Sequence, residues 1–81
     1  MIRKVIDYIK KDEFELRIDN NYINIINYTN INFMEDEKIS LDYEQGKILI
    51  KGKKLTVIKL LDNEILIKGI FTNIEFWRNN E

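Results

Sequence analysis

From Phe14 onward, hydrophobic and polar residues alternate with a period of two almost to the end of the chain. This alternation is typical of β-strands that bury one face and leave the other in water. Asn, Gly and acidic residues interrupt the alternation every seven to ten residues, and they divide it into about eight short predicted strands. The predicted strands are 14–18, 22–27, 30–34, 39–43, 47–51, 54–60, 64–68 and 70–77.

The short connections predict an antiparallel arrangement, because a parallel pair needs a crossover of roughly a dozen residues or more. The fold class is therefore mainly β, an antiparallel meander, a roll or a small sandwich. Asn20-Asn21 and Leu61-Asp62-Asn63 are expected turns, and Gly46 is expected to supply a positive φ to a third. The apolar phase shifts between Val57 and Ile58, which predicts a β-bulge.

An internal repeat allows a second fold. The pentapeptide at 48–52, Ile-Leu-Ile-Lys-Gly, recurs unchanged at 65–69, seventeen residues later. Stepping back by seventeen finds apolar pairs again at 31 and 33 and at 14 and 16. A small β-solenoid with about 17 residues per coil gives the same period, so it remains the alternative to the antiparallel sheet.

The first eleven residues follow a different period. Apolar side chains at 2, 5, 6 and 9 have helical spacing, which predicts a short amphipathic N-terminal helix over residues 2–11. We therefore expect two parts, residues 1–11 as a helix and 12–81 as one β domain. So short a helix needs a surface to lie on. That surface is the domain's own sheet, a partner, or the surface of a membrane, to which its basic residues are suited.

Both faces of the predicted strands carry apolar residues. Ile48 and Ile50 point to one side and Leu49 to the other, and Ile65, Leu66 and Ile67 repeat this pattern. A sheet that is apolar on both sides needs a cover for the second face. We expect the N-terminal helix or another subunit to supply it.

Composition restricts the chemistry. The chain has no Cys and no His, so thiolate nucleophiles, imidazole bases and the usual zinc sites are excluded. Its three glycines are isolated, which excludes a phosphate-binding glycine loop. The carboxylates fall at outward or turn positions, and their spacing is not that of a calcium loop. We therefore expect no enzyme activity, no catalytic residues, no metal, no cofactor and no small-molecule substrate.

Charge is segregated although the net charge is only −1. Residues 1–11 carry four bases and one acid, +3; residues 12–44 carry two bases and nine acids, −7; residues 45–81 carry seven bases and four acids, +3. The acidic middle of one copy, within residues 12–44, is complementary to the basic hairpin of another, at 47–59. This predicts a homo-oligomer whose association weakens as the salt concentration rises. The candidate interaction surface consists of Lys47, Lys51, Lys53, Lys54, Lys59, Glu35, Asp36, Glu37 and Trp77.

The region from Ile25 to Phe76 resembles the YabP/YqfC family of sporulation proteins, most of all its YqfC branch. The most specific matching features are the two strand-then-glycine units at 46–52 and 64–70. Further matches are Asn27-Tyr28, Ile31, Phe33, 39–41, Leu55, Val57 and 74–76. The N-terminus departs from that branch, which tends to have a longer leader with prolines, whereas this chain has no proline.

The resemblance implies a small non-enzymatic protein of endospore formation, made in the mother-cell cytoplasm and acting in spore envelope or coat development. We expect it to work by self-assembly or by docking to a protein partner. The alternative is a small β-barrel-like module that binds nucleic acid or a ligand through the lysine hairpin and Trp77, with Phe71 on the same strand face. With a net charge near zero, nucleic acid is the less expected partner.

Overall fold

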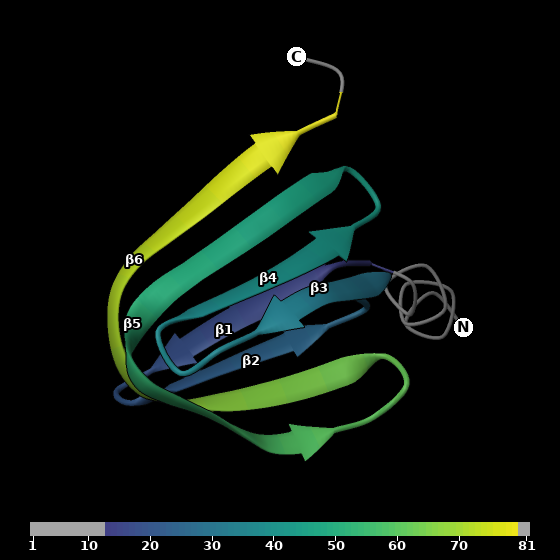
Figure 1. Cartoon of the computed structure of the whole chain (residues 1–81). Helices are drawn as coiled ribbons and strands as arrows, with labels where there is room; N and C mark the ends of the chain where they lie inside the picture. The colour runs from purple at the N-terminus through teal and green to yellow at the C-terminus, as the bar shows by residue number, and fades with distance from the viewer. Residues whose placement is uncertain (1–12, 80–81) are drawn as a thin grey trace.

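A computed structural model describes residues 13–79 as one six-stranded antiparallel sheet (Figure 1). The order across the sheet is β1-β2-β6-β5-β4-β3. The predicted N-terminal helix lies outside the described residues. The strands are β1 (Glu15–Asp19), β2 (Tyr22–Ile26), β3 (Asn30–Met34), β4 (Lys38–Tyr43), β5 (Gly46–Leu60) and β6 (Glu64–Arg78).

The predicted mainly-β class and the strand positions are confirmed, but the count of eight is wrong. β5 and β6 are each 15 residues long, and each joins two of the predicted strands. Gly52 and Gly69 lie inside these strands, not in turns between strands. The β5–β6 register shifts between Lys51 and Gly52 and again between Lys53 and Thr56, and here the hairpin bends strongly (Figure 1).

The bend folds the open sheet over on itself, so that its two halves face each other (Figure 1). Half A contains β3, β4, residues 46–51 of β5 and residues 73–78 of β6. Half B contains β1, β2, residues 64–68 of β6 and residues 56–60 of β5. The antiparallel register of every pair excludes the solenoid alternative.

The core lies between the two halves and consists mainly of isoleucine. β2 and β6 supply it from half B, and β4 and β5 from half A. The fully buried members are Ile23, Ile25, Ile39, Leu41, Ile48, Ile50, Ile65 and Ile67. The seventeen-residue repeat therefore has a structural reason. The first pentapeptide places two isoleucines in the core from half A, and the second places two from half B. Each pentapeptide ends at the glycine where its strand bends.

The turns agree with the sequence except at one glycine. Asn20 has a φ of 49° in the β1–β2 turn, and a register shift lies between Val57 and Lys59, which confirms that turn and the predicted bulge. Gly46, however, is not among the described residues with positive φ. A Cβ at Gly46 would collide with the carbonyl oxygen of Trp77 on β6. Glycine is therefore required here for close strand approach.

Candidate interaction surface

An aromatic cluster lies at one end of half A, and one of its members, Phe76, is the most exposed aromatic side chain of the described residues. Phe14, which precedes β1, stacks on Tyr43 of β4 with ring centroids 4.3 Å apart. Phe76 of β6 approaches Tyr43 edge-on at 6.4 Å. Tyr43 is buried, but Phe76 remains 51% exposed. The aromatic cluster thus begins in the core and ends on an open surface at β6.

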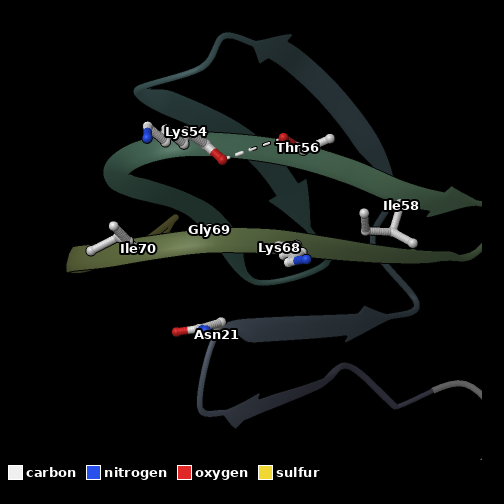
Figure 2. Close-up of a pocket in the computed structure, with 7 residues that line it drawn as sticks. All are labelled: Asn21, Lys54, Thr56, Ile58, Lys68, Gly69 and Ile70. Atoms are coloured by element: carbon white, nitrogen blue, oxygen red, sulfur yellow. Dashed lines mark hydrogen bonds between the residues drawn. The ribbon is translucent and has the colours of Figure 1, made fainter.

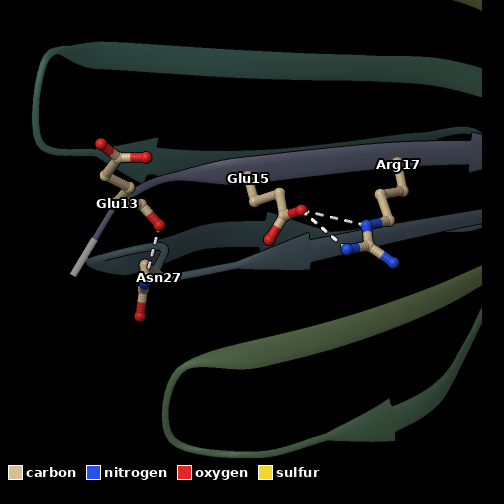
Figure 3. Close-up of polar contacts among 4 residues, drawn as sticks. All are labelled: Glu13, Glu15, Arg17 and Asn27. Atoms are coloured by element: carbon tan, nitrogen blue, oxygen red, sulfur yellow. Dashed lines mark hydrogen bonds and ion pairs between the residues drawn. The ribbon is translucent and has the colours of Figure 1, made fainter. Parts of the chain in front are cut away.

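Phe14 is held in this cluster by a polar contact at the start of half B. The side-chain amide of Asn27 donates to the backbone carbonyl of Glu13 at 2.6 Å (Figure 3). Asn27 has a φ of 69°, a conformation that Asn tolerates better than most residues. Its backbone N–H donates to the carbonyl of Asn63 in the β5–β6 turn at 2.6 Å. One residue therefore joins three segments and fixes the direction in which the chain enters β1.

The C-terminal part of β6 is a free strand edge among the described residues. β2 pairs only with residues 64–68 of β6, so residues 70–78 have β5 on one side and no described strand on the other. The N–H of Asn79 donates to the carbonyl of Gln45. The backbone groups of Asn79 therefore point toward the β5 side. Because backbone groups alternate along a strand, the N–H and C=O of Ile74, Phe76 and Arg78 point away from β5. They form a row of available donors and acceptors.

The other three free edges carry features that oppose strand addition. On β1, the guanidinium of Arg17 donates twice to the carboxylate of Glu15, at 2.9 and 3.0 Å (Figure 3). β3 is five residues long and is irregular at Asn32, between its paired residues Ile31 and Phe33. The part of β5 beyond its pairing with β4 has register shifts and three lysines, Lys53, Lys54 and Lys59, and its first residues bond to the turn between β3 and β4. Among the four free edges of the described sheet, that of β6 alone combines length, aromatic side chains and the absence of Lys and Pro in residues 70–78.

Trp77 lies on the outer face of half A. It is 47% exposed and stands opposite Lys47 in the register. Lys51, four residues further along β5 than Lys47, forms an ion pair with Glu75 at 3.3 Å on the same face. Phe71 packs against the core, because the register shift after Lys51 reverses the direction of its side chain. The predicted common face of Phe71 and Trp77 is therefore wrong.

The predicted acidic and basic segments lie side by side in one chain. The turn between β3 and β4 contains Glu35, Asp36 and Glu37 and borders the bend of β5. The N–H of Gly52 donates to the carbonyl of Glu37 at 3.0 Å, and that of Leu55 to the carbonyl of Asp36 at 2.8 Å. Lys51, Lys53 and Lys54 belong to this bend. Lys59 lies apart in half B, paired with Glu64 at 3.5 Å. Contact between these segments of two copies stays a prediction.

A shallow hollow of about 380 Å³ lies on the outside of the bend, between β5 and β6 (Figure 2). Lys54 and Lys68 line it together with the exposed side chains of Ile58 and Ile70. The hydroxyl of Thr56 donates a hydrogen bond to the carbonyl of Lys54, at 3.3 Å, within β5 itself. The hollow thus offers two amines and apolar walls, with no acidic group among its lining residues.

Sequence reasoning identified Trp77 and the lysines but missed Phe14, Tyr43 and Phe76 as a cluster. Their positions in the sequence lie far apart, and only the folding of half B over half A brings Phe14 to Tyr43. Sequence reasoning also missed Lys38, which stands opposite Lys51 in the register and adds to the basic side of the bend. No local signal marks either grouping.

Tyr28 contacts the turn between β5 and β6, and its pKa is shifted there. Its hydroxyl donates to the carbonyl of Leu61 at 2.6 Å. Burial, and then the negative charge of Asp62, raises the pKa of Tyr28 above the ordinary value of 10.0. The folded protein therefore retains this proton at pH values where the unfolded chain loses it. Its contribution to stability is complete below pH 10 and is lost as the pH rises through the folded-state pKa.

We expect the stability difference between the wild type and Tyr28→Phe to narrow above pH 10. The phenylalanine variant lacks the hydrogen bond at every pH, but it has no proton to lose. Urea unfolding of both proteins below and above pH 10 measures the difference. A gap that stays constant through this range would contradict the shifted pKa.

Residues 13–79 contain no group of three or more acidic, His or Cys side chains arranged to hold a metal ion. In the same part of the chain, no helix has the length and apolar character needed to cross a membrane.

Comparison with known proteins gives a match to a family model. The model of the YabP family matches residues 10–81, a stretch that includes all six strands and the aromatic cluster. No curated protein and no solved structure matches the chain.

Proposed function

The chain belongs to the YabP family, and from this premise we propose that it is a non-enzymatic interaction protein of endospore formation that binds a partner strand at the free edge of β6. Membership of the family is consistent with a role in sporulation. The proposed place of action is the mother-cell cytoplasm, during development of the spore envelope or coat. Within the family we propose the YqfC branch, which the region from Ile25 to Phe76 resembles most.

The free edge of β6 is the observation that carries this function. Natural β-proteins block their exposed edges, because an open edge pairs with other chains. Within residues 13–79, three edges are blocked and one is left open, with Phe76 and Trp77 exposed along it. Addition of a strand to such an edge is a common mode of protein recognition, in which backbone hydrogen bonds give affinity and side chains give specificity. An edge of this kind needs no catalytic group, which agrees with a composition without His or Cys.

Proline at Arg78 tests the edge with little effect on the fold. The N–H of Arg78 points away from β5, so its loss removes a donor from the free edge and leaves the β5–β6 ladder intact. In the bacterium that encodes the chain, we expect Arg78→Pro to lower the yield of heat-resistant spores as far as deletion of the gene does. Arg78→Ala keeps the N–H and should retain the wild-type yield.

Thermal unfolding of both purified variants shows whether they are folded, and immunoblotting shows whether they accumulate. A folded, normally expressed Arg78→Pro protein with wild-type spore yield would refute edge binding as the function.

A second function has one observation in its favour. Trp77 is exposed opposite Lys47 on the outer face of half A. An aromatic ring beside a lysine is suited to stack on a base of single-stranded nucleic acid. Trp77 is the sole tryptophan, so its fluorescence should fall when oligonucleotides are added at low salt. Unchanged fluorescence removes this candidate and leaves the edge-binding function in place.

A further inference from the structure

We infer that the strand which pairs with the free edge of β6 is β6 of a second copy of this chain, antiparallel and centred on Phe76. This pairing deepens the proposed function, on which it rests, by naming the partner. It follows from the residues along the edge, from the exposed half of the Phe76 ring, and from the directions of the two sheet faces.

Residues 74–78 are complementary to themselves. A two-fold axis at Phe76 places Phe76 opposite its own copy, Ile74 opposite Arg78 of the second copy, and Glu75 opposite Trp77 of the second copy. No like charges face each other. A shift of the axis by one residue toward the N-terminus would place the two Glu75 carboxylates opposite each other, and like charges in that position are destabilising. Charge thus favours the Phe76-centred register over the one centred on Glu75.

The backbone geometry suits this register. Ile74, Phe76 and Arg78 are the residues whose N–H and C=O point outward, and the two-fold axis pairs them only with one another. Each pair can therefore exchange two backbone hydrogen bonds, as in an ordinary antiparallel ladder. The axis is perpendicular to the sheet, so the core face of one copy continues into the core face of the other.

The side chains on both faces gain cover. On the core face, the Phe76 ring already forms a T-shaped pair with Tyr43, and the ring of the second copy would cover its exposed part. On the outer face, Trp77 would lie between Lys47 of its own chain and Glu75 of the second copy. The two A halves would then form one continuous sheet with no open edge between them.

Single cysteines test the register, because the chain has none of its own. Opposed residues of a hydrogen-bonded antiparallel pair have Cα atoms about 5.5 Å apart, within the span of a disulfide. We expect Phe76→Cys to form a covalent dimer under mild oxidation. Ile58→Cys is the matched control, since Ile58 is 52% exposed and Phe76 51%. Ile74→Cys should not cross-link, because the pairing separates the two copies of residue 74 by about 13 Å along the strands.

Light scattering coupled to size exclusion tests the dimer itself in the unmodified protein. We expect the wild type and Arg78→Ala to have about twice the 9.8 kDa mass of one chain, and Arg78→Pro to have the mass of a monomer. Either of two results overturns the inference: a wild type that stays monomeric, or cross-linking at Ile74→Cys in place of Phe76→Cys. A monomeric wild type whose Arg78→Pro variant still fails in sporulation would overturn self-pairing alone. The edge would then serve the strand of another protein.

Discussion

Replacement of Ile67 by alanine is expected to lower the free energy of unfolding by about 2–5 kcal/mol, as for other buried isoleucines. Ile67 is 0% exposed in half B, opposite Ile23 on one neighbouring strand and Val57 on the other. Its side chain meets the isoleucines of half A across the core, so truncation leaves a cavity that rigid strands cannot close. A domain of this size has a total stability of about 5–15 kcal/mol. The variant should therefore be close to unfolding.

Ile58→Ala is the matched control, since it makes the same chemical change at a residue that is 52% exposed. We expect a loss of less than about 0.5 kcal/mol there. Urea denaturation measures both variants, and the melting temperature should fall by about 4–8 °C for each kcal/mol lost. Equal losses at the two positions would mean that the core does not lie between the two halves of the sheet.

The local pattern predicts the strands of this protein well, because the signal for a half-buried strand is contained within five or six neighbouring residues. β2 shows this: Ile23 and Ile25 are buried, and Tyr22 and Asn24 face outward, as the alternation requires. The bulge near Ile58 is also visible locally, since a bulge reverses the apolar phase at one point. The class of the fold then follows from the short connections.

The bend could not be predicted, because its cause lies in another strand. In the sequence, Gly52 resembles a turn residue between two short strands. In the structure, it lies within β5, and its N–H donates to the turn between β3 and β4. The same bend shifts the register and turns Phe71 toward the core. A glycine required for close approach and a glycine required for a turn look identical in a sequence.

The candidate site was predicted only in part for a similar reason. The exposure of Trp77 follows from the alternation, so sequence reasoning finds it. The free edge beside it exists because β2 is five residues long and β6 is fifteen, so the pairing ends at Lys68. Strand order decides which edges lack a neighbour, and strand order depends on contacts between distant residues. The sequence pattern contains no signal for it.

Gly52→Ala is expected to cost about 3 kcal/mol or more, the upper part of the range for overpacking. A Cβ at Gly52 would overlap the carbonyl oxygen of Ile70 on β6 and would lie 3.0 Å from the side chain of Leu55. The first obstacle is backbone, which cannot move aside as a side chain does. Local opening of the strand ends cannot remove the overlap, because Gly52 lies in the middle of the long hairpin and not at its end. The two strands must therefore separate where the sheet bends.

Lys53→Ala is the control for Gly52→Ala. Lys53 is the next residue along the same bend, it is exposed, and its truncation to alanine introduces no new atom. We expect its stability to remain within about 0.5 kcal/mol of the wild type.

Separation of the strands at Gly52 would also loosen half B from half A, and with it the contact between Phe14 and Tyr43. Near-ultraviolet circular dichroism should then weaken for Gly52→Ala at temperatures where Lys53→Ala keeps the wild-type spectrum. If Gly52→Ala melts with the wild type, β5 and β6 do not approach each other as closely as this bend requires.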